Sequence, residues 1–215
     1  MKDEIVVIGG YGNVGGLISR ALGARWPGKV YAAGRNLSRA TQFTSATFGQ
    51  IKPLMVDVQD DAHARLPAKT RLVVMCLDLQ DTRFAERCLH HGIDYVDVSS
   101  NLDCFNKMEQ IQQQGKLWSA TAVLSVGLAP GLSNLMAKAA ARLLEQTARI
   151  DIAVLLGLGD VHGRAAMEWT VDSLHTVYSV MEQGQALQVR SFTDPKRFQF
   201  GAHPEHPVGF HLFKL

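Results

Sequence analysis

Cysteine is scarce in this 215-residue sequence, and the three cysteines form no Cys-x-x-Cys pair. We therefore expect neither a disulfide framework nor a cysteine-based zinc site, and a reducing, cytoplasmic location follows from the same scarcity. Runs of one charge are also missing. The 22 Lys and Arg are scattered and the formal net charge is only +2, which argues against a nucleic-acid-binding protein.

Long apolar runs are missing as well. The longest uncharged stretch, residues 117–137, is interrupted by polar residues, a proline and a glycine, so we expect no membrane span. The chain begins with an acidic segment and a short apolar run that ends at Gly9, which predicts a buried strand and not a signal peptide. With 47% apolar and 20% charged residues, the composition is that of a globular protein.

Short apolar runs alternate with helical periodicity over residues 1–126. We expect strands at 5–8, 29–33, 54–58, 72–77, 95–98 and 121–126. Helices should begin at Val14, should span 38–48 with Ser38 as the N-cap, and should span 81–91 and 103–114. The first helix should turn Val14, Leu17, Ile18, Ala21 and Leu22 to the core. This alternation predicts an α/β fold, a Rossmann-type doubly wound parallel sheet.

The alternation of strands and helices ends before Gly127, where we place the boundary between domains 1–126 and 127–215. The second part should be a smaller α+β domain that binds the substrate and forms the dimer. We expect a turn at 127–131, helices at 132–144 and 165–182, and strands at 150–156 and 186–192. The apolar run 150–156 needs cover on both faces, which predicts a homodimer. The alternative is cover from the 132–144 helix and the tail.

A glycine-rich motif follows the first expected strand. Gly10, Gly12 and Gly15 fit GxGxxG, and they lie between a strand and a helix as a dinucleotide-binding loop requires. The helix N-terminus would bind the pyrophosphate, with Tyr11, Asn13 and Val14 completing the loop. Gly9, Gly12 and Gly15 also fit the GxxGxxG spacing of short-chain dehydrogenases. Those enzymes use Tyr-x-x-x-Lys, and no tyrosine here has a lysine four residues later.

The end of the second expected strand favours NADP over NAD. NAD sites place Asp or Glu about 20 residues after the last glycine to bind the ribose 2′-hydroxyl. Residues 33–39 contain no carboxylate and instead contain Arg35, Asn36, Ser38 and Arg39, whose guanidinium groups suit a 2′-phosphate. The alternative is that both arginines are ordinary surface residues.

Four segments resemble the saccharopine dehydrogenase-like family of NADP-linked reductases. They are residues 7–15, 33–36, 95–99 and 127–134, and the resemblance covers about residues 4–195. It implies a nucleotide domain followed by an α+β domain whose sheet often forms a dimer interface. It also implies reduction of an imine formed from an amino group and an aldehyde or keto acid, or the reverse oxidation.

The resemblance also implies roles for single residues. Asp57 and Val58 would flank the adenine, Cys76 and Leu77 would lie along the pyrophosphate and nicotinamide ribose, and Asp97 to Ser99 would approach the nicotinamide. Asp97 is the catalytic candidate, and the alternative is a carboxylate that only caps its loop. The substrate-side candidates are Ser100, Gly127, Pro130, Gly131, Asn134, Glu168 and Trp169.

Some features carry no expected chemistry. His203, His206 and His211 lie among prolines without a supporting cysteine, so we expect no metal site.

Members of the resembled family are usually longer than this chain, so the second domain is either reduced or part of a longer chain. The sequence predicts an NADP(H)-dependent oxidoreductase acting on a C–N or C=N bond of an amino-acid-derived small molecule. The alternative is a non-catalytic NADP(H)-binding sensor or partner subunit.

Overall fold

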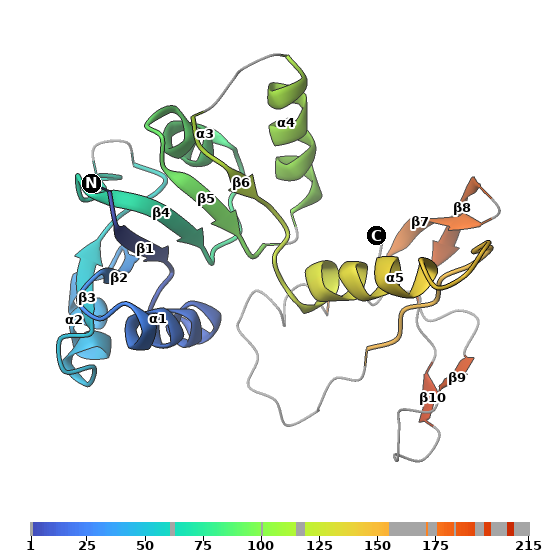
Figure 1. Ribbon diagram of the computed structural model, residues 1–215, viewed down its shortest axis with the longest axis horizontal. Coiled ribbons are helices and arrows are strands. Elements are labelled where there is room, and N and C mark those ends of the chain that lie inside the picture. The colour runs from blue at the N-terminus through green and yellow to red at the C-terminus, as the bar shows by residue number, and fades with distance from the viewer. Residues whose placement is uncertain are drawn as a thin grey trace. The chain divides into compact units, whose positions relative to one another are not determined.

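The computed structural model describes residues 2–60, 63–99, 101–114, 119–154, 171, 176–182, 184–191, 196–198 and 206–208. The chain divides into two compact units, Met1–Gly127 and Leu128–Leu215 (Figure 1).

The first unit is built on a parallel sheet of six strands. They are β1 (Glu4–Ile8), β2 (Val30–Gly34), β3 (Ile51–Met55), β4 (Thr70–Met75), β5 (Asp94–Asp97) and β6 (Ala122–Val123). Their order is β3-β2-β1-β4-β5-β6, and every pairing is parallel. The order reverses between β1 and β4, which is the switch point at which doubly wound folds bind ligands. The predicted fold class is confirmed.

Helices cover both faces of this sheet (Figure 1). The helices are α1 (Asn13–Arg25), α2 (Leu37–Ser45), α3 (Arg83–His90) and α4 (Leu102–Gln113). Side chains of α1 and α2 pack on a cluster around Val7 and Val74, and those of α3 and α4 pack on a cluster around Val6 and Tyr95. Successive residues of β1 therefore enter opposite cores, as strands buried on both faces require.

The prediction of the buried face of α1 was correct only in part. Ile18 and Leu22 pack on the core, whereas Val14 and Leu17 are 54% and 72% exposed. The buried residues are Gly15, Gly16, Ser19 and Gly23. A Cβ on Gly23 would lie only 2.6 Å from Ile51 Cγ1, so the helix approaches the sheet closely through its smallest residues. Apolar periodicity therefore identified the helix and part of its packed face, but not the small residues that lie closest to the sheet.

Two further boundaries differ from the predictions. The third strand runs over Ile51–Met55 instead of 54–58 and includes Pro53, which is tolerated because β3 is an edge strand. The N-cap of α2 is Asn36 and not Ser38, because Asn36 Oδ1 accepts a 2.9 Å hydrogen bond from Arg39 N–H. In α3, which lies within the predicted range 81–91, the residues Phe84, Ala85, Cys88 and Leu89 are buried.

The second unit contains a kinked turn η1 (Leu128–Leu132), helix α5 (Ser133–Ala141) and two antiparallel strand pairs. Strand β7 (Val177–Glu182) pairs with β8 (Gln185–Arg190), and β9 (Lys196–Phe198) pairs with β10 (His206–Val208). The helix predicted over 165–182 was therefore wrong at its end, where β7 lies; Val171 is helical, and residues 165–170 and 172–175 lie outside the described residues. The strand predicted at 150–156 was also wrong over 150–154, which form no strand.

Few side chains are buried in the described part of the second unit. Among the residues of this unit whose burial the structure describes, only Ser133 and Ser191 are buried, whereas Leu135, Met136 and Leu143 of α5 and the turn after it are 63–86% exposed. The described part of this unit thus has no apolar core of its own.

Candidate nucleotide-binding site

The candidate site lies where the carboxyl ends of β1, β2, β4 and β5 meet. Loop hydrogen bonds join these ends: Cys76 N–H donates to Ile8 O at 3.0 Å, and Val98 N–H donates to Met75 O at 3.1 Å. Most of the residues predicted to bind the cofactor follow these strand ends directly. The fold therefore gathers residues that are far apart in the sequence at one edge.

The loop after β1 turns at Gly9, whose φ of 74° favours glycine. Gly9 and Gly10 both donate their N–H groups to Ala33 O, and Gly12 N–H donates to Gly9 O at 2.9 Å. The residue with left-handed backbone is thus Gly9, one position before Gly10, the first glycine of the GxGxxG motif.

The motif glycines have different surroundings. A Cβ on Gly10 would lie 2.6 Å from Val7 O, and one on Gly15 would collide with Gly9 O, so both sites are closed by backbone. Gly12 is the exposed N-cap of α1, and a Cβ there would meet only Gly9 O at 3.2 Å. The backbone at the start of α1 is thus open, as an approaching pyrophosphate requires.

Ser19 is a site residue that the sequence analysis missed. Its side chain is fully buried, and its Oγ donates a 2.9 Å hydrogen bond to Gly10 O. Its spacing of four residues from Gly15 on a helix was the available signal, because that spacing places it on the same face.

The end of β2 brings together Tyr11, Asn36 and Arg39. Asn36 N–H donates a 3.0 Å hydrogen bond to the Tyr11 hydroxyl, and the Arg39 guanidinium lies 5.5 Å from the centroid of the Tyr11 ring. Arg35 and Ser38 are exposed at the same strand end. No carboxylate lies between residues 33 and 39, so the groups present fit a phosphate.

The ends of β3 and β4 place the other predicted cofactor residues. Asp57 and Val58 lie in the loop after β3, where Asp57 Oδ1 accepts from Gln59 N–H at 3.1 Å and Val58 packs on the core. Leu77 lies against the Gly9 backbone, because a Cβ on Gly9 would be 2.9 Å from Leu77 Cδ2. Burial, and then the nearby charge of Asp97, raise the pKa of the Cys76 thiol to about 12, so this cysteine is no nucleophile at neutral pH.

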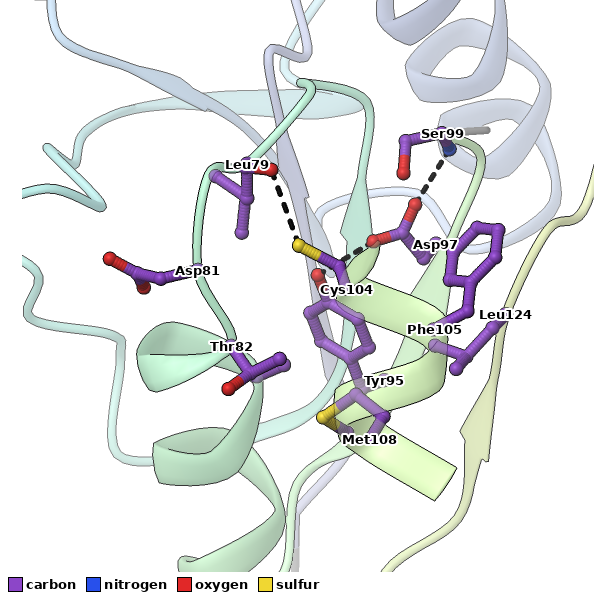
Figure 2. Close-up of a pocket in the computed structure, with 11 residues that line it drawn as sticks. Leu79, Asp81, Thr82, Tyr95, Asp97, Ser99, Cys104, Phe105, Met108 and Leu124 are labelled. Atoms are coloured by element: carbon purple, nitrogen blue, oxygen red, sulfur yellow. Dashed lines mark hydrogen bonds between the residues drawn. The ribbon is translucent and has the colours of Figure 1, made fainter. Parts of the chain in front are cut away.

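Both carboxylate oxygens of Asp97, the catalytic candidate, have partners (Figure 2). The Tyr95 hydroxyl donates to Oδ2 at 3.0 Å, and Ser99 N–H donates to Oδ1 at 2.6 Å. Asp97 is only 6% exposed. These contacts are those of a carboxylate that fixes its own loop, which was the alternative to catalysis.

The cavity beside Asp97 is too small for a substrate. It is lined by Leu79, Tyr95, Cys104, Phe105 and neighbouring residues, and its volume is about 10 Å³ (Figure 2). That is about the space of one water molecule. Cys104 Sγ donates to Leu79 O at 3.3 Å and closes one side of it.

Apart from Gly127, the predicted substrate-side residues lie outside the described part of the first unit. Ser100, Glu168 and Trp169 lie outside the described residues. Gly127 ends the first unit, and Pro130, Gly131 and Asn134 belong to the second. There Asn134 Oδ1 accepts from Gly131 N–H at 3.0 Å and from Ser133 Oγ at 3.2 Å, which holds the turn before α5.

Two classes of feature are absent from the described ranges. No helix there is both long enough and apolar enough to cross a membrane. The same residues form no group of three or more His, Cys, Asp or Glu suited to a metal ion. His203 and His211 lie outside the described part of the chain.

Comparison with solved structures gives matches of low identity. Apo saccharopine dehydrogenase (L-Glu forming) from Saccharomyces cerevisiae is 18% identical over 65% of this chain, with a TM-score of 0.49. A short chain dehydrogenase/reductase family oxidoreductase from Aeromonas hydrophila is 13% identical over 62% of this chain and 90% of its own, with a TM-score of 0.40. The chain spans 31% of the length of the yeast protein.

Comparison with protein families is more specific. No curated protein matches the sequence. The family model for the saccharopine dehydrogenase NADP binding domain matches residues 5–124, which is more than half of the chain. The matched range runs from β1 to β6 and includes the glycine loop and the end of β2. The chain therefore belongs to the saccharopine dehydrogenase family, and residues 5–124 form its NADP-binding domain.

Proposed function

We propose that this protein is an NADP(H)-dependent oxidoreductase acting on a C–N or C=N bond of an amino-acid-derived substrate. The observation that carries the proposal is the open N-terminus of α1 beside a strand end with two arginines and no carboxylate. When bound, the cofactor supplies or accepts the hydride. The chain contributes the phosphate loop, the 2′-phosphate contacts at residues 35–39 and the loops after β3, β4 and β5.

Asp97 and Ser99 line the β5 end of this proposed site. With both oxygens of Asp97 engaged, its role in our proposal is to hold the loop that borders the nicotinamide. The substrate side would come from Ser100, the 127–134 turn, Glu168 and Trp169. Those assignments rest on the family pattern.

The experiment is an NADPH oxidation assay with the 215-residue chain and pairs of an amino acid with a keto acid or an aldehyde. We expect NADPH consumption that requires both partners and yields a secondary amine by mass spectrometry. A second candidate function is a non-catalytic NADP(H)-binding subunit. It is favoured by the hydrogen bonds that both oxygens of Asp97 already accept, from Tyr95 and Ser99. Tight NADPH binding without turnover for any pair would support that candidate instead.

We also propose a cytoplasmic homodimer. The three cysteines are free, as a reducing compartment allows. The exposed apolar residues of α5 and the turn after it, Leu135, Met136, Leu143 and Leu144, need cover, and a two-fold contact between copies is the commonest way to provide it. Light scattering at micromolar concentration tests this. A 23.6 kDa species that does not change on tenfold dilution would contradict it.

A further inference from the structure

The Tyr11 ring lies directly on the backbone at the end of β2. A Cβ built on Gly34 would lie 2.5 Å from Tyr11 Oη, 2.8 Å from Cζ and 2.9 Å from Cε1. The three nearest atoms therefore all belong to Tyr11. The ring crosses from the phosphate loop to the strand end, in the space that any side chain at position 34 would take.

The Tyr11 hydroxyl is held there with its proton available. Its oxygen accepts a 3.0 Å hydrogen bond from Asn36 N–H. A phenol has one proton to donate, and no group within the described ranges accepts it. The Arg39 guanidinium, 5.5 Å from the ring centroid, lies over the same ring. A hydroxyl donor and a cation thus lie side by side at this strand end.

The position and the polarity of these groups indicate what they bind. Arg35 follows Gly15 by 20 residues, which is where dinucleotide-binding folds recognise the substituent on the adenosine ribose C2′. Two acceptors nearby are already used, since Asn36 Oδ1 accepts from Arg39 N–H and the Tyr11 oxygen accepts from Asn36 N–H. Of the side chains that remain, Arg35 and Arg39 are donors only, and the Ser38 hydroxyl can donate as well as accept. A ribose hydroxyl needs an acceptor here, whereas a phosphate is an acceptor only.

We propose that Tyr11 is a specificity-determining residue whose hydroxyl donates a hydrogen bond to the 2′-phosphate of NADP(H), beside Arg39. Gly34 is also required for this contact, because its lack of a side chain leaves room for the Tyr11 ring. Asn36 fixes the hydroxyl oxygen through its backbone N–H. The inference rests on NADP(H) binding by the proposed function and adds the residue that distinguishes the phosphate from a hydroxyl.

The first test is a fluorescence titration of the 215-residue chain and its Tyr11→Phe variant with NADPH and NADH. The variant keeps the ring and loses only the donor, so NADPH binding should weaken about tenfold to a hundredfold, as for other hydrogen bonds to charged groups. NADH binding should change by less than about twofold. Tyr31→Phe is the matched control, because it removes a hydroxyl from β2 that instead donates to Glu4 Oε1.

Several outcomes separate this inference from the proposed function. If the unaltered chain binds no NADPH, the proposed function fails and the inference fails with it. If the unaltered chain binds NADPH but Tyr11→Phe binds it equally well or more tightly, only the inference is overturned. An equal loss for NADPH and NADH would also overturn it, since the hydroxyl would then not distinguish the phosphate.

The second test is a double-mutant cycle between positions 11 and 34. Gly34→Ala should weaken NADPH binding at least tenfold when Tyr11 is present, because the new methyl must displace the ring. In a Tyr11→Ala background the same change should have less than about a twofold effect, since the three nearest atoms are gone. An equal effect of Gly34→Ala in both backgrounds would show that Tyr11 does not mediate it.

Discussion

Ser19 Oγ, buried in the middle of α1, donates a 2.9 Å hydrogen bond to the carbonyl oxygen of Gly10. This bond couples the helix to the loop that precedes it. The same face of α1 presents Gly15, whose missing side chain lets the helix contact the Gly9 backbone. Helix α1 therefore holds the phosphate loop in place through Ser19 and Gly15. The N-terminus of the same helix is the part that would bind the pyrophosphate.

Ser19→Ala should destabilise the first unit by about 1–3 kcal/mol, because it leaves the Gly10 carbonyl without its buried partner. NADPH binding should weaken as well, since the loop loses a support. Urea unfolding and a cofactor titration measure the two effects. Ser45→Ala is the control: Ser45 Oγ donates to Gln42 O on an exposed face, and the change should cost less than about 0.5 kcal/mol. Equal costs for both variants would refute the coupling.

Gly12→Val and Gly15→Ala should fail in different ways. Position 12 is exposed, has an ordinary φ of −81°, and a Cβ there would meet a single atom, Gly9 O at 3.2 Å, so the Val variant should fold and lose NADPH binding. A Cβ at position 15 overlaps Gly9 O, so that variant should lose stability first. Circular dichroism and calorimetric titration separate these outcomes. Tight NADPH binding by Gly12→Val would place the cofactor site elsewhere.

Arg35→Ala tests the cofactor choice. Arg35 is exposed directly after β2, so its removal should leave the fold unchanged. The loss of a charged contact of about 1.5–3 kcal/mol should weaken NADPH binding roughly tenfold to a hundredfold and leave NADH nearly unchanged. Arg71→Ala, which changes another exposed arginine on β4, is the control. Equal losses for the two cofactors on titration would show that Arg35 does not bind the 2′-phosphate.

The strands and helices of the first unit could be predicted because each has its own local signal, but their contacts could not. Period and turn residues located β1, β4, α3 and α4 to within a few positions. The fully buried residues of α1 were missed because they are glycines and a serine, which have no apolar signal but make the close contact with the sheet. The Asn36 cap was missed because Ser38 is an equally good cap by residue type.

The second unit was harder to predict because its apolar runs are not buried. Ile150 and Ile152 remain 53% and 37% exposed, and no strand in the described ranges pairs with them. An apolar run forms a strand only where another strand pairs with it, so the apolar composition of residues 150–156 was not enough to predict a strand. For β7 the missed signal was Gly184, whose φ of 78° allows the turn into β8.

In the site, the glycine motif and the arginines after β2 were visible in sequence. The hydrogen-bonded pairs Tyr11–Asn36 and Tyr95–Asp97 were not predicted from the sequence. The first joins residues 25 positions apart, and such a contact depends on how β1 and β2 lie side by side. The second follows from the spacing of two on a strand, which puts both side chains on one face, and could have been found.

Tyr95→Phe and Asp97→Ala should each destabilise the first unit by about 1–3 kcal/mol, because each leaves a buried polar group without its partner. The double variant should cost less than the sum of the two, since both remove the hydrogen bond between Tyr95 and Asp97. If Asp97 only positions its loop, Asp97→Asn will not shift the pH profile of turnover. Loss of one limb of that profile would instead show that Asp97 transfers a proton.

The buried Cys88 thiol predicts a loss of stability at alkaline pH. Burial raises its pKa from 9.0 to about 12 in spite of nearby Arg87, so the folded state binds the proton more tightly than the unfolded state. Its contribution is fully present below pH 9 and is lost as the pH rises from 9 toward 12. The free energy of unfolding of the unaltered chain, relative to Cys88→Ala, should therefore fall by about 1.4 kcal/mol per pH unit above 9. Urea titrations from pH 8 to 10.5 measure this difference, and a constant difference over that range would contradict the prediction.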